Sequence, residues 1–219
     1  MKTFYTSLLT CLMAAAFFVG CGGDPQMAAD LNALKTESGA KKRDAILHLA
    51  GKGKAAHRAT PLLIEAFKDE DAGVRRAALE ALPVIISSPT QEMTDAIISL
   101  TEDPDAGVQT SALQALSALK ATDALIEASA KVMQTGAKAN RVSACVLLLE
   151  LKEKAAPATD ALIEALGSDD PQLQMHAALA LGEIGSPAAK ALPALQKVKK
   201  TSDEEIAACA ASAIKKIGG

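Results

Sequence analysis

Acidic side chains recur along this chain in short clusters that could hold a hard cation. Four clusters stand at similar spacing: Asp69-Glu70-Asp71, Glu102-Asp103-Pro104-Asp105, Asp169-Asp170 and Asp203-Glu204-Glu205. Several carboxylates close together can coordinate Ca²⁺. Alternatively, one aspartate of each cluster caps a helix, because its side-chain oxygen accepts hydrogen bonds from free N–H groups and its charge complements the helix dipole. The positions at which helices begin decide between these two interpretations.

The three histidines give no pattern of catalytic or metal-binding residues. His48, His57 and His176 are scattered and have no cysteine or carboxylate at ligand spacing. None belongs to a zinc pattern or to a nucleophile–histidine–acid triad. The glycines of residues 51–54 lack the spacing and the preceding strand of a phosphate-binding loop. We therefore expect no catalytic residue, no metal and no cofactor, and we do not expect an enzyme.

The N-terminus has the organisation of an export signal. Lys2 is followed by an uncharged stretch that ends at Cys21 and is too short for a membrane-spanning helix but suits a secretory leader. Residues 18–21, Phe-Val-Gly-Cys, resemble a bacterial lipobox. This resemblance implies removal of residues 1–20, lipid attachment at Cys21, a tether over residues 21–26 and a lipid-anchored place in the bacterial cell envelope, at the outer membrane or facing the periplasm. The alternative is an ordinary signal peptide with an incidental cysteine.

Composition excludes several classes of protein. Aromatic residues make up 2% of the 219 residues, Trp is absent, and of the five aromatics only Phe67 lies outside the first twenty residues. A base-stacking nucleic-acid platform or an aromatic cage needs exposed rings. The net charge of −3 gives no basic field for a duplex or an anionic membrane. The abundance of Ala and Leu favours close-packed helices over β-sheets, and we expect no nucleic-acid partner.

An internal repeat organises the rest of the chain. The phrase Asp-Ala-Leu-Ile-Glu-Ala at residues 123–128 recurs at 160–165, with related segments at 61–67 and 95–100. Each is followed by a polar turn and a second apolar segment. We number that segment from an anchor residue, which falls at position 41, 74, 108, 140, 173 or 206. Six units of about 33 residues therefore account for residues 27–219 as one domain.

Both segments of each unit are predicted to be helices. Apolar or small residues stand 4, 5, 8 and 11 positions after the anchor, as at Ala177, Ala178, Leu181 and Ile184. This spacing is one face of an amphipathic helix. A two-helix hairpin cannot bury its apolar surface alone, so we expect the hairpins to stack into an all-α solenoid.

The unit resembles a HEAT repeat, in particular the short PBS-lyase HEAT-like repeat. Residues 161–171 and 177–185 carry the resemblance most clearly. It implies an α-solenoid of about six two-helix repeats wound as a right-handed superhelix. The fourth unit departs from the pattern, since its first helix extends from Asp123 to about Thr135 and Ala137 stands where other units have an acid.

Alignment of the units assigns roles to the acids and the remaining cysteines. Asp71, Asp105, Asp170 and Asp203 all lie three residues before an anchor, where a helix must begin, so we expect them to be caps. Cys145 and Cys209 lie two repeats apart, about 16–20 Å at ordinary helix spacing, and a disulfide needs about 4.4–6.8 Å between Cα atoms. Both are predicted to be free thiols.

The resemblance also implies a binding face, because second helices line the concave surface of HEAT-like solenoids. Positions 2 and 6 after each anchor should then face the groove. The candidate partner-binding residues at these positions are Arg76, Glu80, Gln114, Val142, Val146, Met175 and Leu179. The last four make an apolar patch on adjacent repeats. The alternative is that these four residues belong to the core.

We therefore expect a non-catalytic, lipid-anchored scaffold that binds another protein and is itself a monomer. Two alternatives stay open. Some chains with this repeat are bilin lyases, which act on chromophores of phycobiliproteins, and the chain could be an enzyme-associated subunit of that kind. It could also be a structural spacer of the envelope without a specific ligand.

Overall fold

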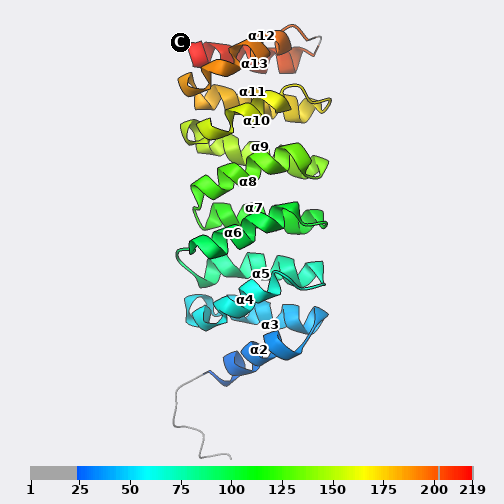
Figure 1. The fold of residues 1–219 in the computed structure, drawn as a ribbon, viewed down its shortest axis with the longest axis vertical. Coiled ribbons are helices and arrows are strands. Elements are labelled where there is room, and N and C mark those ends of the chain that lie inside the picture. The colour runs from blue at the N-terminus through cyan, green and yellow to red at the C-terminus, as the bar shows by residue number, and fades with distance from the viewer. Residues whose placement is uncertain (1–23, 202, 219) are drawn as a thin grey trace, which may run out of the picture.

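A computed structural model of the chain describes residues 24–201 and 203–218. In these residues, twelve α-helices pair into six antiparallel hairpins that stack in a single column (Figure 1). The hairpins are α2 (Pro25–Thr36) with α3 (Gly39–Gly51), α4 (Thr60–Ala66) with α5 (Ala72–Ile85), α6 (Gln91–Ser99) with α7 (Ala106–Ala118), α8 (Thr122–Thr135) with α9 (Lys138–Leu151), α10 (Thr159–Ala165) with α11 (Pro171–Ile184), and α12 (Leu192–Val198) with α13 (Glu204–Gly218). The predicted all-α solenoid of six repeats is confirmed. Cys21 and the predicted leader lie outside the described residues.

The second helix of each hairpin begins where the repeat predicts. Each anchor is the third residue of its helix, from Lys41 in α3 to Ile206 in α13. The position four residues after the anchor is alanine in all six units, and all six alanines are buried: Ala45, Ala78, Ala112, Ala144, Ala177 and Ala210. A small side chain at this point lets successive second helices approach one another closely.

Aspartate caps fix four of these six helix starts. Asp71 accepts the N–H of Gly73, Asp105 accepts that of Val108, and Asp170 accepts that of Gln172, at 2.7, 3.0 and 3.1 Å. Asp203 accepts the N–H groups of Glu205 and Ile206. The capping interpretation is confirmed. Within residues 24–201 and 203–218, no group of three His, Cys, Asp or Glu side chains could hold a metal ion.

Helix α2 begins at Pro25, two residues before the expected domain start at residue 27. Asp24 accepts the N–H groups of Gln26 and Met27, and Pro25 occupies the first helical position. Proline is favoured there because the N–H it lacks would have no partner within the helix. Pro25 and Gln26, assigned to the tether from sequence, are therefore the start of α2.

The two helix layers pack differently. Except for α7 and α9, neighbouring second helices contact one another extensively, whereas neighbouring first helices touch much less. The contact between α11 and α13 is the most extensive, and a Cβ built on Gly182 would lie 3.0 Å from the Cα of Ala213. The second-helix layer is therefore the closely packed layer of the column.

Short 3-10 segments separate some second helices from the first helix that follows them in the chain. They are η1 (Gly53–Ala59), η3 (Lys152–Ala158) and η4 (Ser186–Ala191), and each precedes the first helix of its repeat. The remaining 3-10 turn, η2 (Leu100–Glu102), extends α6 instead. Each of the three separating segments buries two alanines: Ala56 with Ala59, Ala155 with Ala158, and Ala188 with Ala191.

The fourth repeat departs from the others as its sequence predicts. Its first helix, α8, reaches Thr135, and Ala137 precedes α9 without any side-chain cap. Its anchor is Asn140, which is buried and polar where most other anchors are apolar. The packing of α9 against α7 is the least extensive among neighbouring second helices.

Candidate protein-binding groove

The seven candidate residues all lie on second helices and none is buried. Arg76 and Glu80 on α5 and Gln114 on α7 are exposed. Val142 and Val146 on α9, with Met175 and Leu179 on α11, are half-buried. Of these four, Val142 packs against the core cluster, whereas the other three lie outside it. The core interpretation therefore applies in part to Val142, and the accessible apolar surface is Val146, Met175 and Leu179.

A pocket of about 270 Å³ opens between α7 and α9 on this layer. Its lining residues are Thr110, Leu113, Gln114, Val142, Ser143, Val146 and Leu147. Most of this lining is apolar, and Leu113 forms its buried floor. The structure thus brings three of the candidates, Gln114, Val142 and Val146, to one cavity.

The polar anchor of the fourth repeat explains why this junction is open. Asn140 donates hydrogen bonds to the carbonyl of Ala106 at 2.8 Å and to Oε1 of Gln109 at 3.0 Å, and it accepts one from Thr110 at 2.8 Å. These bonds tie α9 to the N-terminal turns of α7, in place of the apolar anchor contact of other repeats. The rest of the junction packs less closely and leaves the pocket.

A second, smaller pocket of about 230 Å³ lies between α5 and α7. Glu80 and Gln114 line it together with the exposed Val84. Gln114 lines both pockets, so they follow one another along the second-helix layer. We call this continuous surface, from Glu80 on α5 to Val146 on α9, the groove. Arg76, Met175 and Leu179 line neither pocket and lie on the same layer beyond them.

The charged end of the groove is weakly organised. Arg76 and Glu80 are 3.8 Å apart and both side chains are 52% exposed, so water screens the pair and it contributes little to stability. Ser111 donates a hydrogen bond to Glu80 at 3.3 Å. Both charges are therefore accessible to a partner, beside an apolar pocket.

Among the described residues, two exposed large apolar side chains were not among the candidates. Leu47 on α3 is 54% exposed and Val84 on α5 is 52% exposed. Leu47 occupies position 6 after its anchor, the same place as Glu80 and Val146, so the repeat alignment could have selected it. Val84, next to Pro83, stands ten positions after its anchor, whereas the candidates were chosen only from positions 2 and 6.

A ladder of polar contacts beside the turns was not predicted. The residue after the anchor donates to a carbonyl of its own turn or first helix: Arg75 to Asp69 and Glu70, Gln109 to Asp103, Arg141 to Met133, and Gln174 to Ser168. Some of these side chains also reach the next repeat. The sequence signal is a long donor at this position in five of six units.

Two ion pairs of this ladder join adjacent repeats. Arg75 on α5 donates to both carboxylate oxygens of Asp103, at 2.8 and 2.7 Å, and these side chains are 12% and 5% exposed. The hydrogen bonds to Asp103 raise the pKa of Arg75. In the second ion pair, Nζ of Lys42 on α3 lies 2.8 Å from the carboxylate of Asp69. Burial acts to raise the pKa of Asp69, but the contact with Lys42 and the hydrogen bond from the N–H of Asp71 lower it. The acidic clusters therefore have a second role beyond capping.

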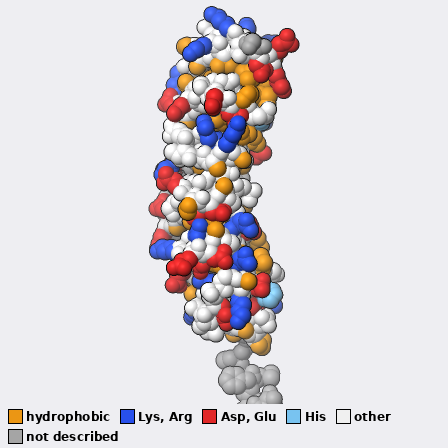
Figure 2. Space-filling model, turned by 90° about the vertical axis from the view of Figure 1, so that its right-hand side faces the viewer, with side chains coloured by type: hydrophobic (Ala, Val, Ile, Leu, Met, Phe, Trp, Pro, Cys, Tyr) orange, Lys and Arg blue, Asp and Glu red, His pale blue; other side chains and the backbone are white. Residues whose placement is uncertain are grey.

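Figure 2 shows the side of the column on which the turns within the hairpins lie. Acidic and basic side chains lie close to one another over most of its length, with apolar atoms between them. Opposite charges alternate, so the surface has no extended field of one sign. The ladder fixes neighbouring repeats in register and thereby holds the second helices that form the groove.

The histidines and cysteines lie in surroundings that suit a structural role. His48 is exposed with Nδ1 3.5 Å from buried Asp30, and Nδ1 of His176 lies 2.7 Å from the carbonyl of Gln172. His57 is exposed. Cys145 and Cys209 are both free, as predicted. No helix among the residues the structure describes is long and apolar enough to cross a membrane.

The two thiols are expected to react at very different rates. Burial raises the pKa of Cys145 to about 12, while burial and the charge of Glu205 raise that of half-buried Cys209. Because the thiolate is the nucleophile, a thiol reagent at pH 8 should label Cys209 slowly in the folded mature chain and Cys145 only after unfolding. Mass spectrometry of timed, quenched samples measures both rates.

The same shift gives a pH dependence of stability. The thiol of Cys145 ionises more easily in the unfolded chain, where its pKa is near the ordinary value of about 9. The stability that the buried, protonated thiol contributes is therefore complete below pH 9 and is lost as the pH rises toward 12. Rapid labelling of Cys145 in the folded chain would contradict this account. Finding no thiol in the unfolded mature chain would show a disulfide instead.

Comparisons with known proteins agree with this architecture. A family model described as HEAT repeats matches residues 28–117 and 126–215. An engineered protein of known crystal structure is 22% identical, with a TM-score of 0.58 over 90% of this chain and 97% of that chain. A designed armadillo repeat protein in complex with the peptide (KR)4 is 17% identical, with a TM-score of 0.57 over 87% and 99%. No curated protein sequence matches the chain.

Proposed function

Because the chain belongs to the HEAT repeat family, we propose that it is a non-catalytic scaffold that binds a protein partner along the groove. The fold is of a kind suited to protein binding, and a structural neighbour was solved with a bound peptide. The proposal concerns this chain's own second helices and the surface they leave accessible.

The apolar pocket between α7 and α9 carries the proposal. It lies at the most open junction of the second-helix layer, it is lined mainly by apolar side chains, and Val146 at its edge lies outside the core. Met175 and Leu179 continue the apolar surface on α11, whereas Arg76 and Glu80 provide charges on α5. A partner segment with apolar side chains at one end and charged groups at the other would match this order. Apolar anchors in such pockets dominate binding energy in protein interfaces.

We further propose that a lipid on Cys21 anchors the scaffold in the bacterial cell envelope. The support is the export signal and its resemblance to a lipobox. Two or more acyl chains give stable membrane attachment where a single chain does not. Mass spectrometry of the mature N-terminus should find Cys21 as an acylated first residue, and Cys21→Ser should move the chain from the membrane fraction to the soluble fraction. An unmodified mature N-terminus would overturn the anchor and leave the groove untouched.

The scaffold proposal is tested by chemical crosslinking in membranes followed by purification of the tagged chain. We expect one or a few proteins to be recovered with the wild-type chain and lost with a groove variant of unchanged thermal stability. Recovery of the chain alone, at native expression and with efficient crosslinking, would instead support a structural spacer.

A further inference from the structure

The three 3-10 segments η1, η3 and η4 each precede the first helix of a repeat and pack against it, and we call them wedges. η3 lies between α8 and α10 and contacts both, and η4 stands in the same relation to α10 and α12. Each wedge inserts two buried alanines into the stack. η1, for example, reads Gly-Lys-Ala-Ala-His-Arg-Ala, with Ala56 and Ala59 buried and the charged side chains exposed. A wedge is therefore a short segment with small inner and charged outer side chains.

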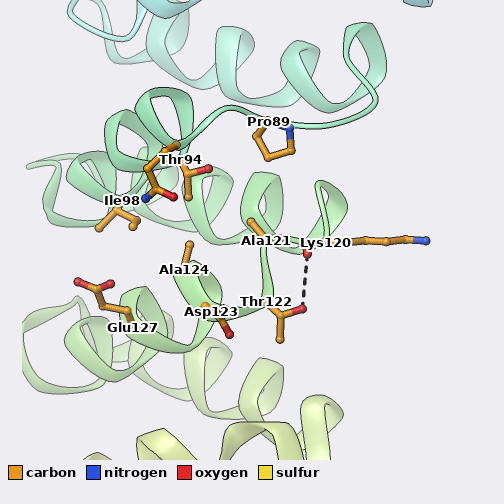
Figure 3. Close-up of a pocket in the computed structure, with 10 residues that line it drawn as sticks. Pro89, Thr94, Ile98, Lys120, Ala121, Thr122, Asp123, Ala124 and Glu127 are labelled. Atoms are coloured by element: carbon orange, nitrogen blue, oxygen red, sulfur yellow. Dashed lines mark hydrogen bonds between the residues drawn. The ribbon is translucent and has the colours of Figure 1, made fainter.

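Wedges are absent from the α4–α6 junction, where residues 86–90 lead into α6, and from the α6–α8 junction. The chain passes from α7 to α8 through only three residues, 119–121, and Lys120 takes a positive φ of 56° to make this tight turn. An open slot of about 490 Å³ remains between α6 and α8. Its lining residues are Pro89, Gln91, Thr94, Ile98, Lys120, Ala121, Thr122, Asp123, Ala124 and Glu127 (Figure 3).

Equivalent residues show the difference between a filled and an open slot. Ala124 on α8 corresponds to Ala161 on α10 in the repeated phrase. Ala161, on the helix that follows wedge η3, is 8% exposed, whereas Ala124 is half-buried and lines the cavity. The α6–α8 slot thus has the walls of a wedge site without the wedge.

The charge of the slot is acidic. Asp123 and Glu127 line it from α8, and in Figure 3 the Lys120 side chain extends away from the other lining residues. Residues 86–118, which include all of α6, contain no Lys or Arg. The exposed Glu92 and Asp95 on α6 add to the negative charge nearby. A cationic segment would be attracted to these walls, more strongly at low ionic strength.

We propose that the α6–α8 slot is a second docking site, which takes a basic segment with small side chains from a partner protein in the position of the missing wedge. The site lies in the first-helix layer, apart from the groove, and does not depend on the proposed groove function. The chain's own wedges cannot supply the segment to a second copy without unfolding, because their alanines are buried in their own repeats. We take the occupant to be a segment of a different protein, and a second copy of this chain is an outcome of the test.

The probe for the test is a synthetic peptide with the sequence of η1, Gly-Lys-Ala-Ala-His-Arg-Ala, acetylated and amidated at its ends. It is titrated into the isotope-labelled chain and followed by NMR. We expect chemical-shift changes at residues of α6 and α8 that line the slot, and roughly a fivefold loss of affinity for Glu127→Gln, which is the size expected for one exposed charge pair. Raising the salt concentration from about 20 to 200 mM should weaken binding as well.

Glu164→Gln is the matched control. Glu164 occupies the same place in the repeated phrase, but it follows wedge η3 and accepts a hydrogen bond from Gln134 at 2.7 Å. This variant should bind the peptide as the wild type does. Ala124→Trp, which fills the slot, should abolish the shift changes with the rest of the spectrum preserved.

Three results would overturn the proposal. They are the absence of slot shifts at millimolar peptide, equal affinities for Glu127→Gln and the wild type, and shifts confined to groove residues such as Val146. The last of these would leave the groove proposal standing, so the two proposals can fail separately. Concentration-dependent dimers that disappear in Ala124→Trp would also overturn it, since they would make a second copy the occupant.

Discussion

Replacing Val146 or Leu179 by aspartate is expected to abolish partner capture while the solenoid stays folded. Both side chains are half-buried and neither packs against the core cluster, so a carboxylate there can reach water in the free protein. In the complex the same carboxylate would be buried without a partner, which costs several kcal/mol. We expect at least about a 100-fold loss of affinity, equivalent to about 2.7 kcal/mol.

The measurement pairs thermal unfolding, followed by circular dichroism, with recovery of the crosslinked partner. Gln196→Asp adds the same charge at an exposed position of α12 and should affect neither. Val142→Asp should lower Tm, because Val142 contacts the core. If Val146→Asp and Leu179→Asp both unfold the chain, these residues are core. If both variants fold and still capture the partner, the binding surface lies elsewhere.

Removing the carboxylate of Asp103 is expected to destabilise the whole column. Arg75 would keep its place between the second and third repeats but lose a bidentate partner in a site where the two side chains are 12% and 5% exposed. Loss of one member of a buried ion pair costs about 3–5 kcal/mol, and the residual access of Arg75 to water brings our expectation to about 2–3 kcal/mol. For a chain of this length, that lowers Tm by roughly 5–10 °C.

Asp105→Ala is the control for Asp103→Ala in the same turn. It removes a helix cap, the hydrogen bond to the N–H of Val108, and a charge near Arg75 while leaving the Arg75–Asp103 hydrogen bonds in place, and it should cost about 1 kcal/mol. Thermal unfolding of the two variants measures the difference. An Asp103→Ala variant as stable as Asp105→Ala would show that the ion pair adds nothing to the contact between the repeats.

The second helices could be predicted from sequence because their determinants repeat and are local. The alanine four residues after each anchor, and the aspartate three before most of them, set the buried face and the start of the helix within one unit. The first helices were less clear. The boundaries of α4, α10 and α12 depend on the wedges directly before them, and two alanines three residues apart do not by themselves distinguish a 3-10 segment from the first turn of an α-helix.

The contacts between repeats could not be read from one unit. The Arg75–Asp103 pair joins residues 28 positions apart in sequence, and its partners are indistinguishable from other surface charges until the repeats are stacked. The groove shows both limits. The facing of Val146 follows from helical periodicity, whereas the pocket beside it depends on the way Asn140 bonds to α7 in place of an apolar anchor.

The central claim, that a protein partner occupies the groove, is tested most directly by a photo-crosslinking amino acid placed at single positions. Gln114 is the best position, since it is exposed and lines both pockets, and Gln196 on α12 is the matched position in the first-helix layer. We predict a crosslinked partner of defined mass from Gln114 and none from Gln196. Crosslinking from Gln196 with none from Gln114 would contradict the account.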